Sequence, residues 1–220
     1  MAAVLTRDHP PVPPAHAGHS AAAVPPEDDA PLPLTVAERA YVSGQFATMA
    51  RRFPDLRMEL TAEGTIVIMA PAHTETGHSN FNIAVQLGQW IMQGGGGYGF
   101  DSSTGFTLPD GSELSPDASW IAKERWDALT KQRKSKFAQI CPDFVIELRS
   151  GSDRLSTLQK KMLRYLDNGV RLGWLLDPRL RRAEIYRAGR DVEVSTNPLS
   201  LSGEDVLPGF VLDLTDIFTE

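Results

Sequence analysis

Three charged residues occupy positions where a purely structural core would prefer apolar side chains. Asp117 follows Pro116 in the strand-like stretch Ser115-Pro-Asp-Ala-Ser-Trp-Ile121. Glu147 interrupts the apolar run from Phe144 to Leu148, and Lys161 lies in a helix-like segment that follows this run. A carboxylate covered on both sides must be paired, bound to a ligand or protonated, because an isolated charge is very costly in an apolar interior. The chemistry open to these residues is therefore ion pairing, cation ligation or proton exchange.

The strand predicted over Asp143–Arg149 decides which way Glu147 points. With a side-chain period of two, Glu147 shares a face with Val145 and Arg149, and the intervening apolar residues share the other face. A short strand with so many consecutive apolar residues is usually central in its sheet and covered on both sides. The alternative is an edge strand that leaves Glu147 in water or paired with Arg149.

A helix predicted from about Arg154 to Asn168 places Lys161 beside an apolar stripe. On a helical wheel Lys160 lies roughly 170° from the centre of the stripe, and Lys161 lies roughly 90° from it. From the edge of the stripe, a lysine can lay its stem along the core and extend past it. The same position also fits ordinary snorkelling at the surface. The stripe consists of Leu155, Leu158, Met162, Tyr165 and Leu166.

Helices and strands alternate in the segments that must position these residues. Thr35 and Glu38 have the spacing of a capping box at the start of a helix that reaches Ala50. A mixed sheet with helices on its faces, an α/β class, fits the order of elements better than an all-β sandwich. We also expect a hairpin of 58–60 and 66–69, followed by a helix that is capped by Thr76 or Ser79 and ended by Gly94–Gly97. Strands are expected over 98–108 and 114–122, joined by the turn Pro109-Asp110-Gly111, and over 174–176 and 183–186.

Composition predicts one globular domain over residues 35–220. The chain has 220 residues, of which 41% are hydrophobic and 23% charged. Residues 1–34 hold eight of the 16 prolines, and we expect them to form a disordered leader. The single cysteine, Cys141, excludes an internal disulfide, and we expect it to be buried and inert. No apolar run approaches the ~20 residues that span a bilayer, so the expected protein is soluble and intracellular.

The net charge of −6 conceals a basic middle region. From Arg149 to Arg190 there are 11 Lys or Arg and 4 Asp or Glu, whereas the segment after Arg190 has seven acidic residues and no Lys or Arg. A second basic run, between the strands that carry Asp117 and Glu147, could flank a cleft and follow a DNA backbone, or it could be a solvated loop. Its basic members are Lys123, Arg125, Lys131, Arg133, Lys134 and Lys136.

Several motifs taken together resemble the Uma2 family, a bacterial group of endonuclease-like proteins in the PD-(D/E)XK nuclease superfamily. The resemblance covers about Thr35 to Phe218. Its motifs are Glu59-Leu60 with Gly64, Pro71 and His78, then Ser115-Pro-Asp-Ala-Ser-Trp120, Pro142-Asp-Phe-Val-Ile-Glu-Leu-Arg-Ser150, Leu158-Gln-Lys-Lys-Met-Leu-Arg-Tyr165, Asp167-Asn-Gly169 and Leu172-Gly-Trp-Leu-Leu-Asp-Pro178.

The resemblance implies a restriction-endonuclease-like fold and a metal-dependent endonuclease that cuts DNA in the bacterial cytoplasm. It implies that Asp117 and Glu147 bind Mg²⁺, for which Mn²⁺ can substitute, and that Lys161 orients the attacking water or stabilises developing charge. Such an enzyme could act on double-stranded DNA as a homodimer. Glu59 could join as an auxiliary acid, or could be an exposed hairpin residue, and Tyr165 could support the site.

Two departures from the family pattern leave other functions open. Arg149 stands where the superfamily usually has its lysine, and it could contact phosphate or pair with Glu147. Gly151 replaces a common proline. The alternatives are an inactive module that binds nucleic acid or protein, and a hydrolase of small phosphoesters. A metal site around His73 and His78 lacks the spacing of a zincin, and Gly94–Gly97 lacks the Lys-Ser/Thr of a phosphate loop.

Overall fold

A six-stranded mixed sheet forms the centre of the fold. The computed structural model describes residues 34–218, so the expected leader lies outside the described residues, apart from Leu34. The strand order is β10-β9-β8-β7-β6-β3, with β7 and β8 parallel and their other neighbours antiparallel. The strands are β3 (Tyr98–Asp101), β6 (Ala118–Ile121), β7 (Phe144–Leu148), β8 (Leu172–Asp177), β9 (Arg182–Arg187) and β10 (Glu193–Thr196).

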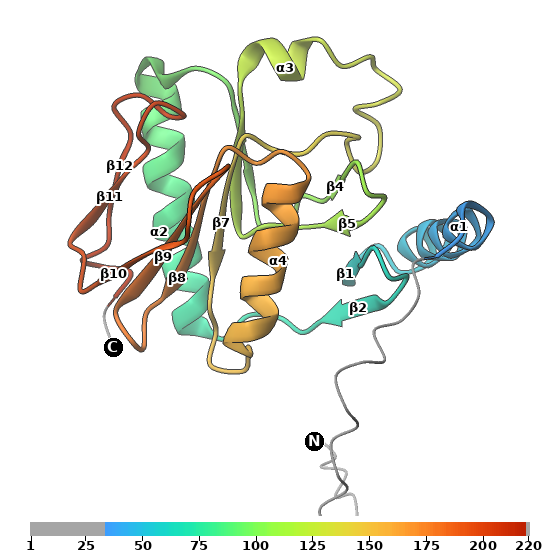
Figure 1. The fold of residues 1–220 in the computed structure, drawn as a ribbon, viewed down its shortest axis with the longest axis horizontal. Helices are drawn as coiled ribbons and strands as arrows, with labels where there is room; N and C mark the ends of the chain where they lie inside the picture. Colours follow the sequence, from blue (N-terminus) through green and yellow to red (C-terminus); the bar gives the residue numbers. More distant parts are fainter. Residues whose placement is uncertain (1–33, 219–220) are drawn as a thin grey trace, which may run out of the picture. The chain divides into compact units, whose positions relative to one another are not determined.

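Helices cover both faces of this sheet, as the α/β class predicts (Figure 1). Helix α4 (Leu155–Asp167) connects the parallel strands β7 and β8 and packs on one face. Helix α2 (Thr74–Trp90) lies on the other face, together with a hairpin of β11 (Ser200–Ser202) and β12 (Val211–Asp213). Strand β7 is central and buried along its whole length, and the side chains on its two faces pack into two different hydrophobic cores. Phe144, Ile146 and Leu148 pack on the α2 side, and Val145 packs on the α4 side.

A smaller sheet and helix α1 extend the fold on the side of α4 (Figure 1). The strand order of the smaller sheet is β2-β1-β5-β4. Its strands are β1 (Arg57–Leu60), β2 (Ile66–Met69), β4 (Phe106–Thr107) and β5 (Glu113–Leu114). Helix α1 (Val36–Arg52) packs on β1 and buries Phe46 against Met58 and Leu60. The expected hairpin of β1 and β2 and the capping box at Thr35 are both confirmed.

Two expected strands are wrong in their extent. Residues 98–108 and 114–122 each divide into two short strands, one in each sheet. Thus β3 pairs with β6 in the large sheet, whereas β4 pairs with β5 in the small one. Pro116, which has no amide hydrogen to donate to a ladder, lies at one of the breaks. Asp117 therefore precedes β6 and is not part of a strand.

Helix α2 and the C-terminal region also differ from expectation. The N-cap position of helix α2 is His73, whose side chain makes no capping hydrogen bond, and it precedes the expected cap at Thr76 or Ser79. The helix continues into a π-helical turn, η1 (Ile91–Gly95). The turn contains Gly94 at a φ of 106°, a backbone conformation that favours glycine. The basic run begins with a short helix, α3 (Lys123–Asp127), and the strands β10 to β12 were not expected. Within residues 34–218 we find no helix with the length and hydropathy needed to cross a membrane.

Candidate active site

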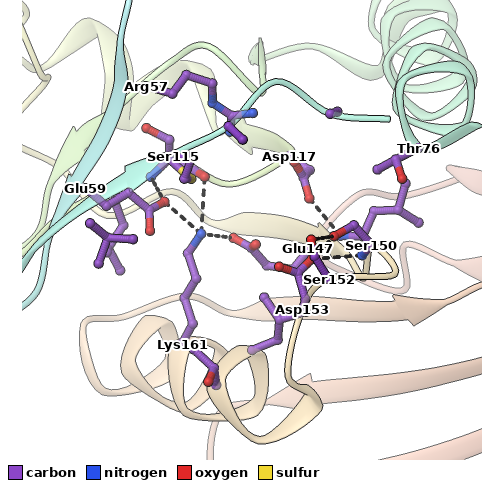
Figure 2. A pocket seen from close by; sticks show the side chains of 18 of the residues that line it. Arg57, Glu59, Thr76, Ser115, Asp117, Glu147, Ser150, Ser152, Asp153 and Lys161 are labelled. Atoms are coloured by element: carbon purple, nitrogen blue, oxygen red, sulfur yellow. Dashed lines mark hydrogen bonds and ion pairs between the residues drawn. The ribbon is translucent and has the colours of Figure 1, made fainter. Parts of the chain in front are cut away.

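A cavity of about 750 Å³ lies where the small sheet meets the central one. It is lined by the β1–β2 hairpin, the start of α2, the segment before β6, the end of β7 with the following loop, and α4. Five of the six residues expected from the sequence lie at or next to this cavity, shown in part in Figure 2. They are Glu59, Asp117, Glu147, Lys161 and Tyr165. Four of them are joined by direct contacts, whereas Asp117 contacts Asn80 and the Leu148 amide instead.

Glu147 is buried on the α4 side of β7, as the period-two pattern predicts. Its side chain is only 4% exposed, so the edge-strand alternative is wrong. One carboxylate oxygen, Oε1, lies 2.9 Å from Lys161 Nζ and accepts a hydrogen bond from the Tyr165 hydroxyl at 3.0 Å. Burial raises the pKa of Glu147, an effect that Lys161 opposes and that the neighbouring carboxylates of Asp117 and Glu59 reinforce.

Lys161 crosses the cavity from α4 and lies between two carboxylates (Figure 2). Besides Glu147, its ammonium lies 2.8 Å from Glu59 Oε1 and donates a hydrogen bond to the Ser115 carbonyl at 3.3 Å. Burial alone would lower the pKa of Lys161, but the two ion pairs outweigh burial and raise that pKa. The side chain therefore remains an ammonium across the physiological pH range, and it can donate hydrogen bonds but cannot act as a base.

Glu59 connects the hairpin to the centre of the site. It is buried in β1, and its Oε1 also accepts a hydrogen bond from the Ser115 amide at 2.9 Å. The alternative that Glu59 is an exposed hairpin residue is therefore wrong. By contacting both Lys161 and Ser115, Glu59 holds the ammonium close to the segment that leads to Asp117.

Asp117 lines the cavity from the segment that joins β5 to β6. Its Oδ2 accepts a hydrogen bond from the Leu148 amide at 2.9 Å, and its Oδ1 accepts one from the Asn80 side chain at 3.4 Å. Burial raises the pKa of Asp117, whereas the hydrogen bond from Leu148 and the charges of Lys161 and Arg57 act in the opposite direction. The bond to Leu148 fixes Asp117 beside the end of β7, next to Glu147.

Arg149 does not join this set, and its expected pairing with Glu147 is not formed. Strand β7 ends at Leu148, and the parallel register of β7 and β8 places Arg149 beside Asp177. Arg149 Nη1 lies 2.5 Å from Asp177 Oδ2, and Asp177 is only 2% exposed. Arg149 is not among the residues that line the cavity. Its guanidinium instead neutralises a buried carboxylate at the end of β8.

Cys141 and His78, also considered from the sequence, lie apart from the site, whereas His73 lines the cavity at the start of α2. Asp143, which follows Pro142 just before β7, has a structural role, because it accepts a hydrogen bond from the Ala122 amide and pairs with Arg125. Cys141 is buried, as expected, and burial raises its pKa to about 12. His78 is exposed on α2 and lies 3.3 Å from the Asn82 amide.

The basic run at 123–136 does not flank the cavity. It follows the C-terminal end of β6, whereas Asp117 precedes the N-terminal end of the same strand. Its residues are absent from the cavity lining, and part of its charge is neutralised by pairs such as Lys123–Asp127 and Arg125–Asp143. The expectation that this run borders the site is therefore wrong.

Two residues of the site were missed by the sequence reasoning. Arg57 lines the cavity from the first position of β1, two residues before Glu59 and so on the same face. Asn80 on α2 donates to Asp117, and its Oδ1 is buried and has no hydrogen-bond partner among the described residues. The alternation from Arg57 to Glu59 could have indicated the first residue. Nothing in the local sequence indicates Asn80.

The residues of the site fit a hard divalent cation. Mg²⁺ usually binds one or two carboxylates together with water and substrate phosphate, and so needs no complete protein cage. Within residues 34–218, no group of three or more His, Cys, Asp and Glu is arranged to hold a metal ion, so a cation here would depend on fewer protein ligands together with water and substrate. Asp117 and Glu147 supply two carboxylates, and the orphaned Asn80 Oδ1 supplies a further oxygen beside Asp117. Glu147 Oε1 is occupied by Lys161 and Tyr165, whereas no described residue donates a hydrogen bond to its Oε2.

Comparison with known proteins gives matches at the level of family and fold. The family model described as "Uma2: Putative restriction endonuclease" matches residues 44–215. A solved structure of a DUF820 protein from Anabaena variabilis ATCC 29413, described as a "putative nuclease", aligns with a TM-score of 0.64 at 21% sequence identity. The alignment covers 73% of this chain and 89% of the other. No curated protein matches the chain.

Proposed function

Because the chain belongs to the Uma2 family, we propose that it is a Mg²⁺-dependent endonuclease that hydrolyses phosphodiester bonds in DNA. The family assignment supports a nuclease in general, and the proposal adds the metal, the substrate and the residues. The observation that carries it is the meeting of Asp117, Glu147 and Lys161 around one cavity, from three segments that are distant in the sequence. Two carboxylates and a neighbouring ammonium are the groups that this chemistry requires.

Asp117 and Glu147 would hold the cation. A bound Mg²⁺ polarises the scissile phosphate, lowers the pKa of a bound water and stabilises the leaving oxygen. Tyr165 fixes the orientation of Glu147 by donating to its Oε1, and the Leu148 amide fixes Asp117. Both carboxylates are thus held in place before substrate arrives.

Lys161 would orient the attacking water and stabilise the charge that develops on the phosphate. The raised pKa keeps its amine protonated, so its role is to supply positive charge, and it would donate a hydrogen bond to water or phosphate by exchanging one of its three present contacts. Glu59 acts on Lys161 as a positioning residue, because it pairs with the same ammonium that lies 2.9 Å from Glu147. Arginine at position 161 could not replace this lysine freely, because its planar guanidinium has a different shape and hydrogen-bonding pattern.

Substrate and assembly belong to the same proposal. Double-stranded DNA is the proposed substrate, and a homodimer would provide one active site for each strand. The bacterial cytoplasm is the proposed location. The two other functions considered, a silent binding module and a small-phosphoester hydrolase, become alternative outcomes of the test. The silent module was favoured by Arg149, which stands in the usual lysine position. Arg149 pairs with Asp177, however, and Lys161 is the cation that contacts Glu147, so the position of Arg149 does not by itself argue against activity.

The proposal is tested by plasmid cleavage with defined metals. We expect the purified protein to nick or linearise supercoiled plasmid with Mg²⁺ or Mn²⁺ and to be inactive in EDTA. We expect Glu147→Ala and Lys161→Ala to abolish cleavage while remaining folded by circular dichroism, and the neighbouring Lys160→Ala to keep it. Retained cleavage in both site variants would refute the assignment. Binding of DNA without cleavage would favour the silent module, and cleavage of small phosphoesters but not plasmid would favour the third function.

A further inference from the structure

Arg57 is a cation of the cavity whose charge the neighbouring side chains leave unpaired. Among residues 34–218 it forms no ion pair within 4.0 Å, and its Nε is buried without a hydrogen-bond partner. The nearby carboxylates of Asp117 and Asp101 act on it only through longer-range charge interaction. A buried donor without a partner destabilises a protein by about 1–3 kcal/mol, so the arrangement calls for a ligand.

The other buried or half-buried cations of the cavity are all neutralised. Lys161 lies between Glu59 and Glu147, and Arg164 pairs with Glu63. Lys160 is exposed to solvent and incurs no comparable desolvation. Arg164 also has a buried nitrogen, Nη1, without a hydrogen-bond partner, but its guanidinium pairs with carboxylates. Arg57 therefore differs from its neighbours in being partly buried without a carboxylate partner among the described residues.

The placement of Arg57 suits a phosphate. Arg57 and Lys161 reach the cavity from opposite sides, Arg57 from β1 and Lys161 from α4, with Asp117 and Glu147 to one side of both (Figure 2). A guanidinium can donate two parallel hydrogen bonds to phosphate oxygens, a geometry that lysine lacks. The antiparallel pairing of β1 with β2, which matches Arg57 with Met69, fixes the backbone from which the side chain projects.

We propose that Arg57 is a substrate-binding residue that donates hydrogen bonds to the non-bridging oxygens of a DNA phosphate in the cavity. This inference rests on the proposed function, since it names the group that receives the substrate in the same site. Arg57 holds the phosphate from the β1 side, and Lys161 acts on it from the α4 side. The scissile group is thereby held between two cations of different shape.

The test uses inorganic phosphate and a short DNA duplex as probes of the full-length protein. Thermal unfolding with and without millimolar phosphate, in EDTA, reports anion binding independently of cleavage. Binding of a labelled 20-base-pair duplex over a range of salt concentrations, with Ca²⁺ in place of Mg²⁺, reports the contact with DNA. The variants are Arg57→Gln and Arg57→Lys, and the matched control is Arg51→Gln, which removes an exposed arginine from the end of α1.

We expect phosphate to raise the Tm of the wild type and of Arg51→Gln but not that of Arg57→Gln, with a partial effect in Arg57→Lys. Arg57→Gln should bind the duplex about tenfold more weakly, and its log–log salt slope should fall by about 1. Equal phosphate stabilisation of Arg57→Gln and wild type, no stabilisation of the wild type, or an unchanged salt slope would each overturn the inference. Plasmid cleavage by the wild type, measured on the same preparation, tests the proposed function separately.

Discussion

Replacing Lys161 with methionine removes the cation that lies between two buried carboxylates. The ammonium lies 2.8 Å from Glu59 and 2.9 Å from Glu147, and the three side chains are between 4% and 14% exposed. Removing one partner of a buried ion pair costs about 3–5 kcal/mol, because the remaining charge is left uncompensated. Both carboxylates border a cavity that admits water, so we expect a loss near 3 kcal/mol, or about two orders of magnitude in the folding equilibrium.

The size of this loss should depend on pH. Without Lys161, the pKa of Glu147 in the folded state rises further above its value in the unfolded chain, because burial is no longer opposed by the ammonium. A carboxyl group with a raised pKa is tolerated at low pH in its neutral form and destabilises the fold as pH rises. The cost of Lys161→Met should therefore be smaller at pH 5 than at pH 8.

Urea unfolding at the two pH values, without divalent metal, measures this effect. Lys160→Met is the matched control, because Lys160 is the preceding residue on α4 and is exposed. We expect the control to change the free energy of unfolding by less than about 0.5 kcal/mol. If the two variants lost equal stability, or if the loss in Lys161→Met did not change with pH, the reasoning about the buried ion pairs would be refuted.

Three further predictions concern Arg149, Glu147 and Cys141. Arg149→Gln should lower the free energy of unfolding by about 2 kcal/mol, because it leaves Asp177 buried and without its ion-pair partner. The same variant should change the rate of plasmid cleavage by less than about threefold. Abolished cleavage at full stability would place Arg149 in the site. In metal-free urea unfolding, Glu147→Gln should gain stability relative to wild type as pH rises above about 4.5, because the raised pKa of Glu147 makes its ionisation unfavourable in the folded state. A difference in the free energy of unfolding that stayed constant with pH would contradict this. Cys141 should be unreactive toward a disulfide reagent at pH 8 until the protein is unfolded, because burial raises its pKa to about 12, and rapid reaction in the native state would show an accessible thiol.

Local sequence patterns were sufficient to predict β7, α4 and the β1–β2 hairpin, and the direction of the side chains of Glu147 and Lys161, but not β10 to β12 or the breaks between β3 and β4 and between β5 and β6. The period of two in β7 placed Glu147 on the face opposite Phe144 and Ile146, and the helical wheel placed Lys161 at the edge of the apolar stripe. Both predictions depend on neighbours a few residues away. The capping box at Thr35 is equally local, and it too is confirmed.

Contacts between distant segments could not be derived in this way. Glu59 and Lys161 are 102 residues apart, and their pairing depends on how the small sheet packs against α4. Arg149 reaches Asp177 because β7 and β8 pair in a particular parallel register, which a single sequence does not specify. The basic run failed as a marker of the site because it follows β6, whereas Asp117 precedes this strand. The antiparallel pairing of β6 and β7 then places Asp117 beside the end of β7, away from the run.

A crystal of the protein soaked in Mn²⁺ tests the central claim most directly, because anomalous scattering identifies the ion independently of activity. We expect one strong anomalous peak in the cavity, within coordination distance of carboxylate oxygens of both Asp117 and Glu147, and no such peak in Glu147→Ala. A peak held by other residues, or none at millimolar Mn²⁺, would contradict that claim.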